Sequence, residues 1–323
     1  MISRAAQEAG VLVLSLAAFL AANTQALALD KRASGALSHY IIGIVHDDLG
    51  DLDKAIQEYK QALKADKENP VIRLSLAESL IKSNQIPQAI EELNFLIRLN
   101  PEAVEPHAIL ALLYSSQNKL VEAAAEYEIA LENAAILNPK NVDIYKSLAA
   151  IYLEQKKFKE AESAYKLVLV LSPDDAKAHF YLANIYNELK NSELAKKELK
   201  RALELKPDYH EVLNFLGYLY VEEGKNLEEA RVLITKALEL DPDNGAYIDS
   251  LGWLYFKQGK LKEAIKELEK ASTLTEDPVI YDHLGDAYLK INDAAGARLN
   301  WEKSLKLDQD QEAVKKKIER LGK

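Results

Sequence analysis

The 323-residue chain contains no cysteine, which excludes disulfide bonds, zinc sites built on thiolates and cysteine nucleophiles. Glycine and proline are also scarce, at twelve and nine residues, so the chain is neither collagen-like nor a turn-rich all-β protein. Positive charge is not in excess, since the formal net charge is −10. Without a basic stripe, the sequence predicts binding to neither nucleic acid nor anionic lipid. Alanine, leucine, lysine and glutamate dominate instead, and these residues favour helices.

Catalytic and cofactor motifs are missing as well. No glycine-rich phosphate loop, G-x-S-x-G or H-E-x-x-H occurs, so we expect neither an enzyme nor a bound cofactor. The best local metal candidate is Asp282, His283 and Asp286, but on a helix the two carboxylates share a face while His283 points about 100° away. Two carboxylates are a poor zinc set, and we predict no metal site. Three further histidines share one repeat position and are expected to pack: His39, His107 and His179.

Long apolar runs are limited to residues 10–22, which carry no charge and are preceded by Arg4. Ala26-Leu27-Ala28 follows as an A-x-A site, so residues 1–28 are predicted to be a secretory signal peptide and the mature chain to start at Leu29. The run is too short for a permanent bilayer span, and no stable span is expected after cleavage. The alternative is an extra amphipathic helix or a mis-assigned start. Residues 29–35 are predicted to be a linker.

Alanine recurs along the rest of the chain at intervals of 33 to 35 residues, with one interval of 38. The alanines are Ala55, Ala89, Ala123, Ala161, Ala195, Ala230, Ala264 and Ala297. Twelve or thirteen residues before each lies a small residue: Gly43, Ala77, Ala111, Ala149, Ala183, Gly217, Gly252 or Gly285. A leucine or isoleucine precedes each small residue, and an aromatic residue or a substitute lies three after it. These constant offsets predict pairs of helices that approach closely and stack on their neighbours.

This pattern resembles the tetratricopeptide repeat over residues 36 to about 311. Departures occur at the second helix's usual alanine (Leu96, Val168, Ser304) and at the terminal proline (Lys67, Glu276, Gln309). The resemblance implies an all-α fold, namely a right-handed α-solenoid of about eight helix-turn-helix units with a C-terminal capping helix. The expected units are 36–69, 70–103, 104–141, 142–175, 176–209, 210–244, 245–277 and 278–311, and the cap is 312–323.

Three local features refine this expectation. Glycine or asparagine after the first helix should adopt the left-handed conformation that stops a helix, at Gly50, Asn84, Asn118, Gly224, Gly259 and Asn292. The 38-residue interval should lengthen the second helix around residues 130–139 by about 6 Å, either as a neutral insertion or as a ridge for a partner. In the cap, Val314, Ile318 and Leu321 share one face and should cover the last unit.

In the tetratricopeptide family the first helix of each unit lines a concave groove. In units five to eight, the groove-facing side of this helix carries asparagine, aspartate and aromatic residues. They form the predicted partner-binding site: Phe180, Asn184, Asn187, Asn214, Tyr218, Asp249, Trp253, Asp282 and Asp286. Asparagine can hydrogen-bond an extended peptide backbone, and Tyr or Trp can anchor it. The alternative is that Asn and Asp are simply solvated and that Trp253 packs against the neighbouring helix.

The resemblance implies a non-enzymatic scaffold that binds a protein or peptide. Chaperone-binding members hold a carboxylate with a Lys/Asn/Arg clamp, which is absent from these positions, so a neutral or basic partner is expected. The stretches 214–218, 249–253 and 282–286 resemble exported bacterial tetratricopeptide proteins. They imply a periplasmic or secreted protein that assembles or tethers a bacterial cell-envelope complex. The alternative, if the signal prediction is wrong, is a cytoplasmic adaptor or co-chaperone.

Overall fold

The structure, a computed structural model, describes residues 31–321, with side chains from residue 34. All regular structure in this range is α-helical and no strand occurs in it, so the predicted all-α fold is confirmed. The predicted signal peptide and its cleavage site lie outside the described residues. Residues 31–35, predicted to be linker, instead belong to the first helix, since Lys31, Arg32 and Ala33 all favour helix. None of the helices in 31–321 is long and apolar enough to cross a membrane.

The contacts divide the chain into two compact halves. The N-terminal half, through Leu171, contains α2 (Lys31–Asp48), α3 (Leu52–Ala65), α4 (Pro70–Lys82), α5 (Ile86–Leu99), α6 (Val104–Ser116), α7 (Leu120–Leu137), α8 (Val142–Glu154) and α9 (Phe158–Leu171). Even-numbered helices are the first helices of repeats and odd-numbered helices the second. Each pair joined by a tight turn packs together, and each second helix also packs on the next first helix of its half.

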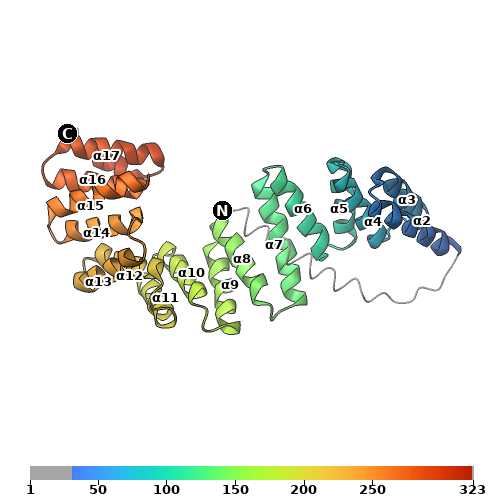
Figure 1. Cartoon of the computed structure of the whole chain (residues 1–323), viewed down its shortest axis with the longest axis horizontal. Coiled ribbons are helices and arrows are strands. Elements are labelled where there is room, and N and C mark those ends of the chain that lie inside the picture. The colour runs from blue at the N-terminus through green and yellow to red at the C-terminus, as the bar shows by residue number, and fades with distance from the viewer. Residues whose placement is uncertain (1–30, 322–323) are drawn as a thin grey trace. The chain divides into compact units, whose positions relative to one another are not determined.

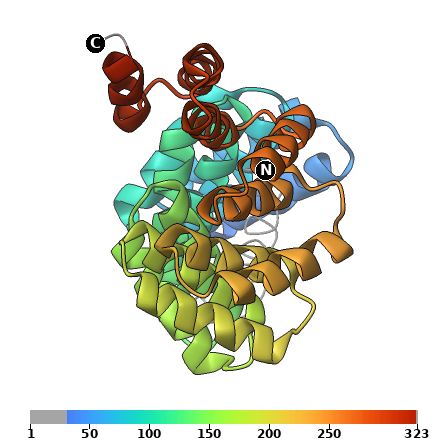
Figure 2. The same cartoon turned by 90° about the vertical axis from the view of Figure 1, so that its left-hand side faces the viewer.

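The C-terminal half repeats this arrangement. It contains α10 (Ala176–Glu188), α11 (Ser192–Leu205), α12 (His210–Glu223), α13 (Leu227–Leu240), α14 (Gly245–Lys257), α15 (Leu261–Leu274), α16 (Pro278–Lys290), α17 (Ala294–Leu307) and α18 (Glu312–Leu321). Figures 1 and 2 show α14 to α17, coloured orange to red, as consecutive helix pairs. First helices also contact one another directly, α12 with α14 and α14 with α16.

Helix ends follow from local chemistry. The side chain of Asn69 accepts hydrogen bonds from the backbone N–H groups of Val71 and Ile72, and Pro70 occupies the first turn, where a missing N–H costs nothing. At the other end, all six predicted turn residues have positive φ, which confirms the left-handed stop. Lys156 and Lys190 take the same conformation in their repeats, with φ of 56° and 59°, although lysine has no intrinsic preference for it.

Small residues allow the two helices of a repeat to touch. A Cβ atom added at Gly43 would lie 2.6 Å from the ring of Tyr59, and one added at Gly285 would lie 2.4 Å from the ring of Trp301. Both distances are far below van der Waals contact. The large residue on the second helix and the small residue on the first are therefore complementary, and neither can grow without moving a helix.

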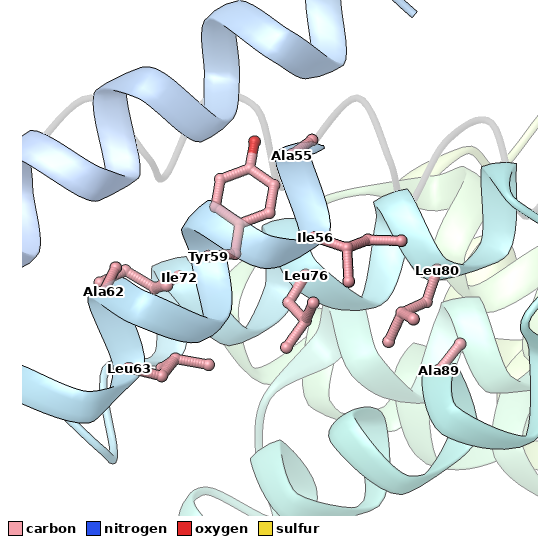
Figure 3. Close-up of a cluster of buried hydrophobic side chains, with 9 residues drawn as sticks. All are labelled: Ala55, Ile56, Tyr59, Ala62, Leu63, Ile72, Leu76, Leu80 and Ala89. Carbon is pink, nitrogen blue, oxygen red and sulfur yellow. The ribbon is translucent and has the colours of Figure 1, made fainter. Parts of the chain in front are cut away.

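The core runs between successive repeats. Figure 3 shows one section, in which Ile56, Tyr59 and Leu63 of α3 pack against the face of α4 that carries Leu76 and its neighbours. Complete burial of each large side chain contributes about 1.5–3 kcal/mol, and no repeat could bury this face alone. The same arrangement recurs between later helices, so stability derives from stacking neighbours.

Two further predictions from the sequence, the longer second helix of the third repeat and the C-terminal cap, are also confirmed. Helix α7 has 18 residues where every other described second helix has 14, so the insertion adds one helical turn. In α18, Val314 is buried against Ala297 and Trp301, and Ile318 and Leu321 pack beside it. The last helix therefore covers the apolar end of the eighth repeat.

Candidate functional site

The first helices of consecutive repeats meet through one recurring pair of positions. Positions are counted from the small residue of each first helix, for example Gly252 in α14 and Gly285 in α16. The side chain three residues before the small residue of one first helix touches the side chain two residues before the small residue of the next first helix. The pairs are Tyr40–Ser75 in the N-terminal half, and Phe180–Phe215 and Asp249–His283 in the C-terminal half. Asp282 of α16 makes the corresponding contact with Lys317 of the capping helix. The predicted site residues three before the small position are therefore used partly for contacts between repeats.

Asp249, Trp253 and His283 form a buried cluster between α14 and α16. His283 Nδ1 lies 3.0 Å and 3.1 Å from the two carboxylate oxygens of Asp249. The His283 ring stacks on the indole of Trp253, with centroids 4.0 Å apart, and Phe256 stacks on the indole at 4.5 Å. The indole N–H donates to Glu222 of α12. Trp253 is only 6% exposed, so it packs between helices and leaves little surface for a partner.

The electrostatics of this cluster favour a charged imidazole. Burial opposes the charge on His283, but the adjacent carboxylate of Asp249, with help from Asp282 and Glu222, outweighs it and raises the pKa of His283. Both members of the pair are almost completely buried. Removal of either one would leave the other as an unpaired polar group inside the protein, which is costly.

Asp282 and Asp286 converge on the capping helix. The ammonium of Lys317 lies 2.7 Å from Asp282 Oδ1 and 2.8 Å from Asp286 Oδ2. Burial raises the pKa of Asp286, and the lysine partly offsets this effect. His283 points to Asp249 instead, so the three residues considered as a metal candidate do not converge. Within residues 34–321, no group of three acidic or histidine side chains is placed to hold a metal ion.

The other predicted site residues lie on α10 and α12 and are half-buried rather than buried. The Phe180 ring packs 5.5 Å from the ring of Tyr209 and edge-on at 6.4 Å from Phe215. Asn184, one turn along, donates from Nδ2 to the Phe180 carbonyl at 2.8 Å. These contacts fix the aromatic group while leaving part of its surface open.

Asn214 is the most unusual polar residue on this face. Its side-chain carbonyl oxygen is buried and finds no hydrogen-bond partner among the described residues. Tyr218, four residues on, shares the face and is half-buried; burial and nearby carboxylates raise its pKa, so the phenol stays neutral. An unsatisfied buried acceptor costs about 1–3 kcal/mol, so this position calls for a donor. Asn187 is also half-buried, at the end of α10.

The sequence analysis did not predict the glutamates that pair with the histidines at one shared repeat position. His39, His107 and His179 each bind a glutamate 19 residues later on the second helix of the same repeat. The partners are Glu58, Glu126 and Glu198, each at 2.6 Å. Arg73 occupies the equivalent position in the second repeat and binds Glu92. The constant spacing of 19 residues between base and acid is the signal that could have revealed them.

Family comparison identifies the repeat. Three tetratricopeptide-repeat models match, one over 48–113 and 153–217, one over 15–70 and 110–176, and one over 210–244 and 247–278. The chain belongs to the tetratricopeptide-repeat family. No match was found among curated proteins.

Solved structures agree on the fold of this tetratricopeptide protein. A tetratricopeptide-repeat protein from Parabacteroides merdae is 17% identical, covers 90% of this chain and 100% of its own, and gives a TM-score of 0.50. The Cut9–Hcn1 complex of APC/C is 19% identical over 84% of this chain and 52% of its own, with a TM-score of 0.56. PilF of Pseudomonas aeruginosa is 17% identical over 67% and 96%, with a TM-score of 0.50. At these identities the likeness shows an all-α repeat solenoid and nothing about ligands.

Proposed function

We propose that this tetratricopeptide protein is a non-enzymatic scaffold that holds an extended segment of a partner along α10 and α12. The observation that carries the proposal is the unpartnered carbonyl of Asn214 beside half-buried aromatic residues. Rotation of the half-buried Asn214 side chain would bring this oxygen, which is buried in the resting chain, to the surface, where a backbone N–H of an extended peptide would satisfy it. Apolar side chains of the same peptide would lie on Phe180 and Phe215, where aromatic surface is available at low entropic cost.

The contacts within the chain support a partner site on α10 and α12 rather than on α14 and α16. Asp249, Asp282 and Asp286 are engaged by His283 and Lys317 in the resting chain. Their negative charges are therefore largely neutralised by side chains of the same protein. Of the neutral or basic partners expected from the sequence, the contacts favour a neutral segment with apolar side chains.

Replacing Asn214 with leucine tests the proposal. Asn214→Leu removes the unsatisfied acceptor while keeping a similar volume, so thermal stability should stay constant or rise. Affinity for a partner captured from the native host should fall roughly tenfold, equivalent to about 1.4 kcal/mol. Val232→Ala, an exposed change on α13, should alter neither quantity. Retained affinity in the leucine variant would place the partner elsewhere.

Trp253 and Phe180 provide a second comparison. Trp253→Ala should destabilise the fold by about 3–5 kcal/mol, because the stacked side chain is buried, and should leave the affinity of the folded fraction nearly unchanged. Phe180→Ala should do the reverse and weaken binding by about 2 kcal/mol. Thermal unfolding and titration on the same two variants separate the roles. A loss of affinity without destabilisation at Trp253 would restore it as the anchor.

The cellular setting is a separate part of the proposal. The apolar run and the A-x-A site support an exported scaffold that assembles or tethers a cell-envelope complex. Intact-mass measurement and fractionation of the native protein test it, with a mature chain beginning at Leu29 as the expected result. A cytoplasmic chain that still carries Met1–Ala28 would support the adaptor alternative.

A further inference from the structure

Helix α7 carries an apolar stripe on its solvent-exposed face. Each residue turns a helix by about 100°, so four of its exposed side chains lie within about 80° of one another around the axis: Val121, Ala125, Ile129 and Ile136. Val121 is 82% exposed and Ile136 is 75% exposed. No large apolar side chain among residues 34–321 is more exposed than Val121. The stripe faces solvent over about four helical turns.

This stripe is specific to α7. Its first three residues lie two before, two after and six after Ala123, the alanine that recurs in every second helix. The equivalent residues of α15 are Lys262, Lys266 and Lys270. Each of the other described second helices has at least one charged or amide side chain at these three positions, and α7 has none. The apolar residues are therefore not required by the repeat itself.

The inserted turn lengthens the stripe. Ile136 is the last residue but one of α7, and the equivalent residues of α5, α11 and α13 are charged, namely Arg98, Glu204 and Glu239. The exposure of the final residue, Leu137, is ordinary, because other second helices also end in an exposed leucine. The insertion therefore places one additional apolar side chain at the end of the stripe.

The charges beside the stripe are acidic. Helix α7 contains four glutamates and neither lysine nor arginine. Two of the four are paired with a histidine and a lysine of the same protein. The other two, Glu122 and Glu132, are exposed and have no basic partner among the described residues, although Glu132 accepts a hydrogen bond from the Tyr152 hydroxyl. Two uncompensated negative charges therefore accompany the stripe, and Glu132 lies between Ile129 and Ile136.

These charges discriminate between possible occupants of the stripe. If a second copy of α7 packed on it, the unpaired glutamates of the two chains would approach one another, and neither helix contains a lysine or arginine to offset them. Like charges brought together in an interface are unfavourable. A helix with an apolar face and lysine or arginine beside it would instead cover the apolar side chains and pair with both Glu122 and Glu132.

We propose that the stripe of α7 is a docking surface for an amphipathic helix of a partner protein, whose apolar face is flanked by basic side chains. The small side chain of Ala125 lets that helix approach closely, and Val121 and Ile136 contact its two ends. The surface lies in the N-terminal half and is distinct from the partner site on α10 and α12. The scaffold then holds one partner as an extended segment and another as a helix.

Two synthetic helical peptides of about 21 residues test the proposal on the full chain. Both carry leucine at the a and d positions of each heptad, and they differ only in the flanking residues, which are lysine in one and glutamate in the other. Titration at low salt should show at least roughly tenfold tighter binding of the lysine peptide. Equal affinities, or a preference for the glutamate peptide, would overturn the proposal.

Ile136→Glu separates docking on the stripe from general attraction to an acidic chain. The added charge strengthens general attraction of the lysine peptide, but it enters the apolar contact, so affinity should fall at least about tenfold. Val232→Glu adds the same charge at an exposed apolar position on α13 and should leave the affinity unchanged. Unchanged or higher affinity in Ile136→Glu, or equal losses in both variants, would show that the peptide does not dock on the stripe.

A charge reversal tests the flanking contact. Glu122→Lys should reduce the preference for the lysine peptide severalfold, because it removes one of the two unpaired charges. Glu160→Lys is the matched control, since Glu160 is exposed at the same repeat position on α9. Equal effects of the two reversals would assign the preference to net charge alone and contradict the proposal.

Sedimentation of the chain alone tests the other occupant. Wild type and Ile136→Glu should sediment identically, because a second copy does not occupy the stripe. A wild-type dimer that Ile136→Glu dissociates and Val232→Glu does not would overturn the proposal and identify α7 as a self-association surface.

Discussion

At the scale of single residues, each described turn between the helices of a repeat contains a left-handed residue. Glycine occupies it at Gly50, Gly224 and Gly259, and asparagine at three other turns. Lys156 and Lys190 adopt the same φ with a Cβ atom, which costs about 1–2 kcal/mol relative to glycine in the folded state. These two turns are the least favourable local choices among those of the described helices.

Lys156→Gly should therefore stabilise the protein. The gain should be about 0.5–1 kcal/mol, because the relief of backbone strain exceeds the extra freedom that glycine gives the unfolded chain. Urea unfolding measures it. Glu154→Gly, at the exposed last residue of α8, is the matched control and should destabilise. A loss of stability in both variants would mean that Lys156 makes a compensating contact.

The Asp249–His283 pair makes stability depend on pH. Because the folded-state pKa of His283 is raised above its ordinary value of 6.5, the charged imidazole contributes stability that is fully present below pH 6.5. That contribution is lost as pH rises through the folded-state pKa. His283→Gln should remove it, so the difference in melting temperature between wild type and variant should shrink from pH 6 toward alkaline pH. A difference that grows with pH would indicate a neutral imidazole in the folded state.

At the scale of helices and their contacts, the repeat predicted the elements well because its signals are local. The spacing of alanine and glycine predicted the helix pairs, and the four extra residues of the 38-residue interval predicted the longer α7. Packing between repeats was harder to predict. Trp253 and Asp249 lie on the expected face, but their burial depends on His283 in the next repeat, 34 residues from Asp249. The two positions that touch are the same in each of these repeats, but their side chains differ from step to step, so no shared residue type marks the contact in the sequence.

The capping helix allows a matched test of one such contact. Lys317 binds Asp282 and Asp286, whereas Lys316 beside it is exposed. Lys317→Ala should lower stability by about 1 kcal/mol, since the pair is only partly shielded from water, and should speed hydrogen exchange in α16 and α18. Lys316→Ala should leave both unchanged. Equal effects would mean that general positive charge, rather than this contact, holds the cap.

At the scale of the molecule, stability is a sum of neighbour terms rather than a property of one centre. Removal of residues 312–323 exposes Trp301 and Ala297, which Val314 covers. Hydrogen exchange should therefore rise first in α16 and α17 and leave α10 and α11 protected. Uniform loss of protection across the C-terminal half would show that its repeats unfold as one cooperative block.

Chains built from similar repeats risk stacking out of order while they fold. The recurring contact between first helices differs from step to step in the C-terminal half, from aromatic with aromatic at Phe180–Phe215 to carboxylate with imidazole at Asp249–His283. If α16 stacked on α10, His283 would meet Phe180 and its charge would be buried without a partner. If α12 stacked on α14, Phe215 would cover Asp249 and leave that carboxylate unpaired. At both contacts, stacking on the wrong repeat would leave a buried charge without a partner. The different side chains at these contacts therefore favour the native order of the repeats during folding.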